Sequence, residues 1–157
     1  MDNGGLVGHG DSDWGNDTAS RRRVAGYLIL INGAPVAWKS KKQGAVTTSS
    51  SEAEWTAMVH GMRHAILLRG ILGELGILEG VTVWYGDSRG AIQAAITEGF
   101  NRRTMHVHIK LKCTREYVSK GVFAVKYIPT ALQLVDILTK RLHKKQVEDF
   151  VDTVLTR

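Results

Sequence analysis

Four acidic residues, far apart in the chain, are the side chains best suited to chemistry. They are Asp11, Glu54, Asp87 and Asp136. Each is flanked by apolar or turn-forming residues, and a carboxylate brought near a core is costly unless a cation meets it. Four converging carboxylates would hold hard divalent metal ions, and such ions with oxygen ligands commonly promote phosphoryl chemistry.

Each acid also has an ordinary structural interpretation. Glu54 follows Ser51 by three residues, which is the spacing of a helix capping box. Asp11 and Asp87 could form or cap turns, and Asp136 could be an ordinary acid at the start of a helix. Their joint order nevertheless favours a shared site, because strand ends and helix starts at one edge of a sheet could bring all four within reach of a metal.

The hydrophobic pattern predicts the elements that must position these acids. Strands are expected at residues 6–11, 24–31, 35–40, 81–85 and 122–128. Helices are expected from 51 to about 75, from 89 to about 97, within 102–120, and over most of 131–155. Asn32-Gly33 is a strong hairpin signal between two of the strands. The alternation of strands and helices indicates an α/β fold.

The long helix should pack closely against the sheet through small side chains, and Gly76 should end it. Its expected buried stripe is Ala57, Gly61, Ala65, Leu68, Leu72 and Leu75. The four tryptophans are expected in the core rather than on nucleotides: Trp14, Trp38, Trp55 and Trp84.

Length and composition limit the class of protein. With 157 residues and 43% hydrophobic residues, the chain is expected to form one domain over 1–157. A net charge of +6 permits an acidic polymer as partner but equally suits a solvated surface. The single Cys113 cannot form an internal disulfide, and no apolar run reaches the roughly 18–20 residues of a membrane span. We therefore expect a soluble intracellular protein without a membrane partner.

Eight motifs, from about residue 6 to 142, resemble the ribonuclease H domain of copia-type (Pseudoviridae) LTR retrotransposon polyproteins, in the same order and at the same spacing. They are Asp11-Ser-Asp-Trp, Arg22-Arg-Val-Ala-Gly-Tyr, Trp38-Lys-Ser-Lys-Lys-Gln, Ser50-Ser-Glu-Ala-Glu-Trp-Thr-Ala, Asp87-Ser-Arg-Gly-Ala-Ile, Arg103-Thr with His106, Arg115-Glu, and Tyr127-Ile-Pro-Thr through Gln133-Leu-Val-Asp-Ile-Leu-Thr-Lys. The chain departs from the family pattern at Trp55, at 105–108 and at Arg141, but none of these changes removes a candidate metal ligand.

The resemblance implies a ribonuclease H-like fold with a five-stranded mixed sheet in the order 3-2-1-4-5 and helices on both faces. It also implies a ribonuclease H, which hydrolyses the RNA strand of RNA/DNA hybrids during reverse transcription. Two Mg²⁺ ions, for which Mn²⁺ could substitute, would be held by Asp11, Glu54, Asp87 and Asp136 as catalytic residues. The hybrid and an attached or associated reverse transcriptase are the expected partners. The expected location is the cytoplasm, virus-like particles or the nucleus.

Basic side chains are expected to bind the phosphates of the hybrid. The candidates are Arg102, Arg103, Lys110, Lys112 and Arg115 on one side, with Lys39, Lys41 and Lys42 on the other. His143 follows Asp136 by seven residues, on nearly the same face of the expected helix, and is a candidate general base or product-release group, although a solvated histidine on a helix surface has the same pattern. His106 and His108 alternate as strand neighbours would and suggest a metal site, although no third ligand is nearby.

Two other functions remain open at this stage. A detached and repurposed domain could bind nucleic acid or a protein without catalysing cleavage. Retention of all four acids nevertheless favours catalysis. An integrase or transposase core shares the same kind of metal chemistry. The fourth acid and the position of Glu54 on the first long helix argue against that class.

Overall fold

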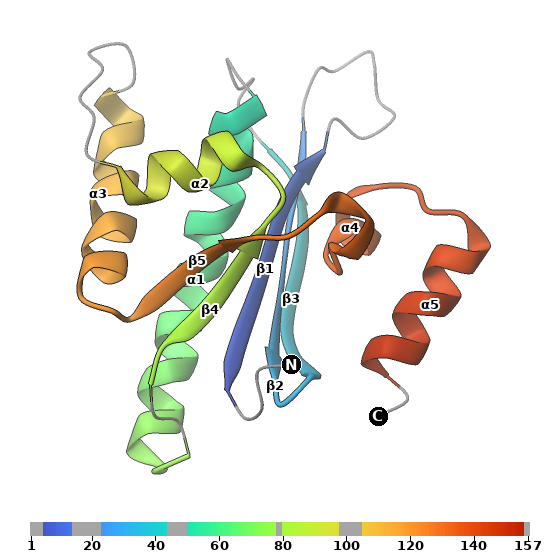
Figure 1. The fold of residues 1–157 in the computed structure, drawn as a ribbon, viewed down its shortest axis with the longest axis horizontal. Coiled ribbons are helices and arrows are strands. Elements are labelled where there is room, and N and C mark those ends of the chain that lie inside the picture. Colours follow the sequence, from blue (N-terminus) through green and yellow to red (C-terminus); the bar gives the residue numbers. More distant parts are fainter. Residues whose placement is uncertain (1–4, 14–22, 44–49, 78–79, 98–104, 156–157) are drawn as a thin grey trace.

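Five strands form one mixed sheet in the order β3-β2-β1-β4-β5, as the resemblance implies. The computed structural model describes residues 5–13, 23–43, 50–77, 80–97 and 105–155 (Figure 1). The strands are β1 (Leu6–Asp13), β2 (Val24–Ile31), β3 (Ala34–Lys42), β4 (Thr82–Gly86) and β5 (Phe123–Tyr127). β1 is central: it pairs antiparallel with β2 and parallel with β4, while β3 and β5 form the two edges.

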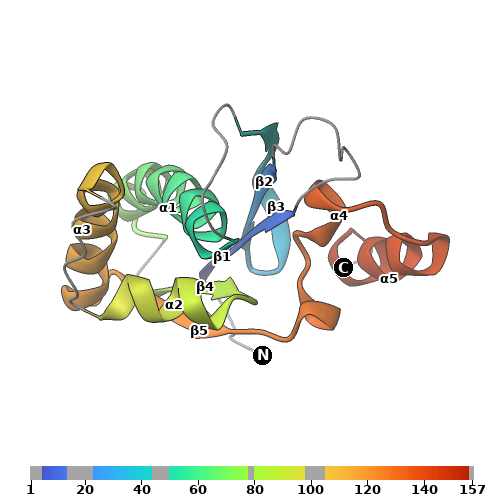
Figure 2. The ribbon, with the colours of Figure 1, turned by 90° about the horizontal axis from the view of Figure 1, so that it is seen from above.

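Helices cover both faces of the sheet (Figures 1 and 2). They are α1 (Ser50–Glu74), α2 (Arg89–Ile96), α3 (Met105–Ser119), the 3-10 turn η2 (Thr130–Leu132), α4 (Asp136–Thr139) and α5 (Lys144–Val154). Helices α1, α2 and α3 lie on one side, and α4 and α5 lie on the other. No helix among the described residues is long and apolar enough to cross a membrane.

The larger core lies under α1 and is built around Trp84, which is completely buried on β4. A Cβ atom at Gly8 of β1 would come within 2.1 Å of the Trp84 ring, and one at Gly61 of α1 within 2.3 Å. Only glycine therefore lets the strand and the helix close on both sides of this indole. The expected close packing of α1 is confirmed, since Ala57 and Ala65 are buried as well.

The C-terminal part of the predicted stripe on α1 is less buried than expected. Leu68 and Leu72 are only partly buried against the core, and Leu75 is 64% exposed. The helix ends at Glu74, and Gly76 has a positive φ of 69°, which is typical of a glycine that terminates a helix. The expected end of the helix is confirmed, but the last turn of α1 extends beyond the edge of the core and is largely exposed.

A smaller core covers the opposite face of the sheet. Leu28 and Leu30 of β2 meet Val135 and Val154 there, while Tyr27 and Ile29 of the same strand face the larger core. Because β2 is buried on both faces, its sequence is an unbroken apolar run rather than an alternating one. Asn32 and Gly33, with φ of 51° and 84°, then form the expected tight hairpin into β3.

The segment 131–155 is mostly helical, as expected, but it is not the continuous helix that would place His143 on the same face as Asp136. The segment is divided into η2, α4 and α5, and the backbone is extended at Lys140 (φ −122°, ψ 156°) and at His143 (φ −69°, ψ 153°). Gln133, between η2 and α4, is buried with its side chain against β1. Contacts with the sheet thus override a locally favourable helical pattern.

Candidate active site

Asp11 lies near the end of the central strand and is almost completely buried. Its Oδ2 atom accepts a hydrogen bond from the Thr139 hydroxyl of α4 and lies 3.4 Å from Nζ of Lys140. The neighbour of Asp11 on β2 is Gly26, where a Cβ atom would come within 2.7 Å of the Thr139 methyl group. Glycine at this point of β2 therefore makes room for the threonine that binds the buried acid.

Asp87 directly follows β4. Because β1 and β4 run parallel, their carboxyl ends meet at one edge of the sheet, and this brings Asp87 beside Asp11. One carboxylate oxygen of Asp87 accepts a hydrogen bond of 2.8 Å from the Thr130 hydroxyl. The next residue, Ser88, caps α2 by accepting a hydrogen bond from the backbone N–H of Ala91, as its sequence position predicts.

Asp136 is the first residue of α4, a helix on the face of the sheet opposite α1 (Figure 2), and its carboxylate reaches the same edge as those of Asp11 and Asp87. The preceding Val135 is fully buried in the smaller core and so anchors this short helix. Burial raises the pKa of Asp136 to about 6; a hydrogen bond from Lys140 acts in the opposite direction, and the charge of Asp11 adds to the rise.

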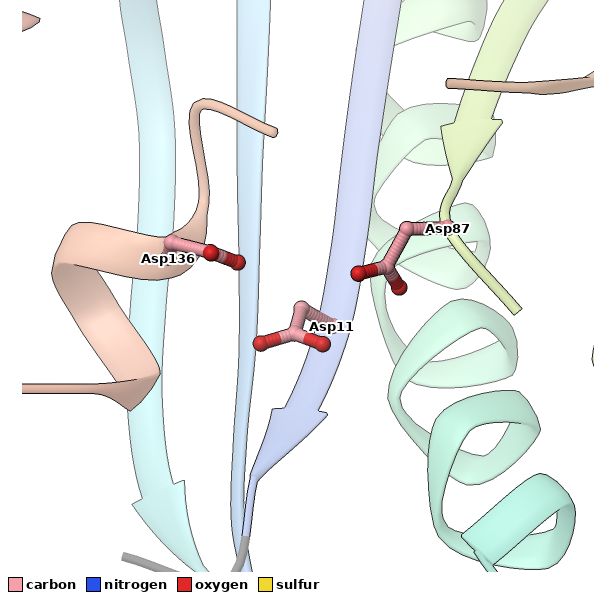
Figure 3. Close-up of side chains that lie close together, drawn as sticks. All are labelled: Asp11, Asp87 and Asp136. Carbon is pink, nitrogen blue, oxygen red and sulfur yellow. The ribbon is translucent and has the colours of Figure 1, made fainter. Parts of the chain in front are cut away.

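The three aspartates converge on one point (Figure 3). One ligand oxygen from each of Asp11, Asp87 and Asp136 lies within 4.8 Å of the other two. The carboxylates come from a strand, from the turn after a second strand, and from a helix on the far face. This all-oxygen arrangement suits a hard divalent cation.

Glu54 borders the cluster from α1 but is not one of the three converging acids. Burial raises its pKa to about 8, and the charges of Asp11 and Asp87 add to the rise. Its carboxylate accepts a hydrogen bond from the backbone of Ser12 in β1. The helix begins one residue earlier than expected, at Ser50, and the carboxylate of Glu54 contacts the sheet, while the side chain of Ser51, the other half of the predicted capping box, lies outside the described residues.

Several sequence relatives of the chain are retrotransposon polyproteins. The chain is 32% identical over 146 residues to the Retrovirus-related Pol polyprotein from transposon RE2 of Arabidopsis thaliana, covering 92% of this chain and 10% of that protein. It is 32% identical over 143 residues to the one from transposon TNT 1-94 of Nicotiana tabacum, covering 91% and 11%. The chain thus spans about a tenth of the length of these relatives. No protein-family model matches it.

Solved structures with the same fold are ribonucleases H. The N-terminal RNase H domain of rv2228c from Mycobacterium tuberculosis superimposes with a TM-score of 0.62 at 12% identity, covering 98% of this chain and 97% of that one. LC11-RNase H1 in complex with RNA/DNA hybrid gives a TM-score of 0.62 at 13% identity, covering 85% and 93%. The chain has a ribonuclease H fold and is a homologue of copia-type retrotransposon Pol polyproteins. Both expectations of family and fold are confirmed.

Five residues that the sequence did not predict as part of the site lie in or beside it in this ribonuclease H fold: His9, Thr130, Gln133, Thr139 and Lys140. Thr130, Thr139 and Lys140 bind the carboxylates directly. His9 lies two residues before Asp11 on β1, and its Nδ1 is 2.8 Å from Oε1 of Gln133. Gln133 and the three that bind the carboxylates lie in a motif that supports the resemblance, and His9 lies in the strand that carries Asp11, but their sequence positions alone did not reveal these contacts.

His9 and Gln133 join β1 to the segment before α4. Burial lowers the pKa of His9 to about 4, although the hydrogen bond with Gln133 acts in the opposite direction. A neutral imidazole therefore donates its Nδ1 proton to the amide oxygen of Gln133. The amide nitrogen of Gln133 in turn donates to the backbone oxygen of Gly10, at 3.4 Å. This pair holds the chain in place three residues before Asp136.

Lys140 carries the positive charge closest to the cluster among the described ion pairs. Its Nζ is 2.9 Å from Oδ1 of Asp136. Burial acts to lower the pKa of Lys140, but the hydrogen bond with Asp136 and the negative charge of Asp11 outweigh it and raise the pKa. Lys140 is therefore charged throughout the neutral range.

The predicted phosphate-binding residues occupy several different positions. Arg102 and Arg103 lie outside the described residues, as does the side chain of Lys110 on α3. Lys112 is exposed, whereas the Arg115 guanidinium donates to the backbone oxygen of Ala94 and so ties α3 to α2. Sheet register places the exposed Lys41 and Lys42 at the same end of the sheet as Asp11, and Lys39 is exposed on the same strand.

The structure corrects the predictions for three histidines. His106 and His108 lie on α3 rather than on a strand, and helix positions two apart do not face each other. Their side chains are outside the described part of the chain. His143 caps α5, with the extended segment after α4 between it and Asp136, so the two do not share a helical face.

Proposed function

We propose that this chain is a ribonuclease H that hydrolyses the RNA strand of RNA/DNA hybrids with divalent metal ions at the cluster of Asp11, Asp87 and Asp136. The observation that carries the proposal is the convergence of these carboxylates within 4.8 Å at the rim of a ribonuclease H fold. A solved neighbour in complex with RNA/DNA hybrid and the Pol polyprotein relatives support the same substrate.

The chemistry of the donors fits Mg²⁺, with Mn²⁺ as a substitute. Every candidate ligand is a carboxylate oxygen, and Asp11 and Asp136 are buried, which makes an uncompensated negative charge unfavourable. Asp11, Asp87 and Asp136 would hold the ions, with Glu54 at the border of the site. Bound divalent ions lower the pKa of a coordinated water and offset the charge that develops on a phosphate.

The protein's own groups position this site before substrate arrives. Thr139 and Thr130 each donate a hydrogen bond to one aspartate, Asp11 and Asp87 respectively. A hydroxyl that binds one lone pair fixes the plane of the carboxylate and leaves its other lone pairs free. Each threonine thus orients one metal ligand, and the ordered carboxylates lose less freedom when a cation binds.

Electrostatic attraction would capture the hybrid. Lys41 and Lys42, at the end of the sheet that carries Asp11, are proposed to contact phosphates together with Arg102, Arg103, Lys110, Lys112 and Arg115. Such contacts carry no base specificity and weaken as salt rises. A reverse transcriptase, attached or associated, is the proposed protein partner, and the cytoplasm, virus-like particles or the nucleus is the proposed location.

Cleavage of an end-labelled RNA/DNA hybrid tests the proposal. With Mg²⁺ or Mn²⁺ we expect cuts in the RNA strand only, none with EDTA, and none in duplex DNA. Asp87→Asn should abolish cleavage, because the amide removes a negative charge from the cluster while Asp87 is only half-buried, so that the fold tolerates the change. Asp149→Asn, on the exposed surface of α5, is the matched control and should cleave normally.

The opposite result would support a different class of function. Tight binding of the hybrid without cleavage, in either metal, would contradict the proposed enzyme. It would indicate instead a module of the same fold that binds nucleic acid or protein without catalysis.

A further inference from the structure

Lys140 lies between two of the three converging aspartates. Its Nζ is 2.9 Å from Oδ1 of Asp136 and 3.4 Å from Oδ2 of Asp11. The side chain is only 24% exposed, and the carboxylates that it contacts are nearly buried. The ammonium group of Lys140 therefore lies between the carboxylates of Asp11 and Asp136 and is largely shielded from solvent.

The local backbone holds this lysine at the site. Lys140 is the C-cap of α4, and its N–H donates to the backbone oxygen of Asp136 at 2.8 Å. This one-turn spacing brings the side chains of residues four apart together. The adjacent Thr139 donates to the same Oδ2 atom of Asp11, so two successive residues converge on one oxygen.

An ammonium and a divalent ion compete for these carboxylates. Both cations are attracted to the same partly buried negative charge, and like charges in a site of low dielectric repel strongly. Without either cation, Asp11 and Asp136 would repel each other in a buried setting. A lysine side chain can exchange between a position at the carboxylates and a position away from them, because its charge is compact and its four-carbon stem is flexible.

We propose that Lys140 is a tethered cation that holds Asp11 and Asp136 together in the metal-free protein and is displaced when a divalent ion binds. The inference rests on the proposed function only in requiring that the cluster binds such an ion. Release of Lys140 then opposes metal binding, so this lysine sets the metal affinity of the site. It also prevents the empty cluster from becoming a centre of unpaired negative charge.

Calorimetric titration of the full chain with Mg²⁺ and with Mn²⁺, at alkaline pH, measures this competition. Lys140→Met removes the competing charge while retaining the stem, and we expect about tenfold tighter metal binding. Lys140→Arg should bind metal more weakly than the wild type, because a guanidinium grips carboxylates in a bidentate manner. Lys144→Met is the matched control, since Lys144 forms an exposed ion pair with Glu148. The affinity of this variant for metal should equal that of the wild type.

The metal dependence of the melting temperature provides a second readout, because loss of a merely structural lysine would lower the melting temperature equally with and without metal. Lys140→Met should melt lower than the wild type in EDTA, and saturating Mg²⁺ should raise its melting temperature more than that of the wild type. An equal loss with and without metal, together with unchanged affinity, would overturn the proposal.

Labelling of amines in the wild-type chain tests the displacement without any substitution, even where Lys140→Met fails to fold. Mass spectrometry should show that Mg²⁺ accelerates the modification of Lys140 and leaves that of Lys144 unchanged. If the wild type binds metal but labelling of Lys140 is unchanged or slower, the displacement is wrong while the proposed function stands. If neither the wild type nor Lys140→Met binds metal, the proposed function fails first, and this inference with it.

Discussion

The two faces of the sheet hold the candidate site in different ways. On one face, α1, α2 and α3 pack over a large core around Trp84 and Phe123. On the other, the short α4 and α5 cover a small core formed by Leu28, Leu30 and two valines. Glu54 approaches the site from the first face and Asp136 from the second, while Asp11 lies on the strand between them.

This difference separates global stability from the integrity of the site. Elements with few buried apolar contacts open locally at a lower free energy than the main core. We therefore expect Asp136, with Thr139 and Lys140, to leave the cluster by a local opening of α4 while the rest of the sheet remains folded. Glu54 and Asp87 should leave only when the whole domain unfolds.

The largest expected effect comes from the large core. Trp84→Ala should lower the free energy of unfolding by about 3–5 kcal/mol, because it removes a fully buried indole from between two glycines that cannot fill the space. Urea denaturation measures the change. Trp38→Ala is the control, since Trp38 is 61% exposed, and it should change stability by less than about 1 kcal/mol. Equal losses in the two variants would contradict the assignment of the main core.

The second effect is a dependence of stability on pH in the metal-free protein. Glu54 has a pKa of about 8 when folded and 4.5 as its ordinary value, so the folded state binds its proton more tightly. The contribution of Glu54 to the free energy of unfolding is then greatest below pH 4.5, falls as pH rises, and is lowest above about pH 8, by about 2–4 kcal/mol. Asp136, raised to about 6, adds to the fall at lower pH.

Substitution of Glu54 tests which face produces this slope. Glu54→Gln cannot ionise, so its unfolding free energy, measured by urea titration in EDTA, should be nearly flat between about pH 6 and 8. Glu148→Gln, on the exposed side of α5, should retain the slope of the wild type. A slope that survives in Glu54→Gln would assign the effect to another group.

A smaller loss of stability is expected from removing the hydroxyl groups that bind Asp11 and Asp87. Thr139→Val keeps the shape of the side chain but leaves a buried carboxylate oxygen without its hydroxyl partner, which should cost about 2 kcal/mol. Thr130→Val makes the same change beside the half-buried Asp87 and should cost less than about 1 kcal/mol. Thermal or urea denaturation of both variants compares them, and a larger loss in Thr130→Val would reverse the expected order.

A modest loss of stability in the small core should be the most local. Val135→Ala removes two methyl groups from the small core, worth about 1–2 kcal/mol. Hydrogen exchange should become faster in α4 and α5 but stay unchanged in β1 and β4. Uniformly faster exchange through the sheet would show that the two faces unfold as one unit.

Much of the architecture could be predicted from the sequence. The apolar run of β2, the Asn32-Gly33 turn and the small residues of α1 each indicate their local structure directly, because they reflect the periods and dihedral angles that those elements require. The four acids were recognised by type and by motif order. Three of them converge, and the fourth lies at the border of the cluster.

Other features depended on contacts between distant residues. Trp38 was expected in the core but is exposed, because it lies on the edge strand β3, where a neighbouring strand and a helix layer cover fewer side chains. The last predicted helix was too long, since buried Gln133 and the extended Lys140 interrupt its local pattern. His143 lost its expected relation to Asp136 for the same reason.

The sequence by itself determined the order of strands and helices and the identity of the acids, because hydrophobic periodicity and turn residues act over a few neighbours. Only the tertiary structure decided which groups meet those acids. The threonine hydroxyls, the His9–Gln133 pair and the ammonium of Lys140 reach the site through contacts that mostly span 43 to 129 residues of chain, and no local pattern encodes such distances.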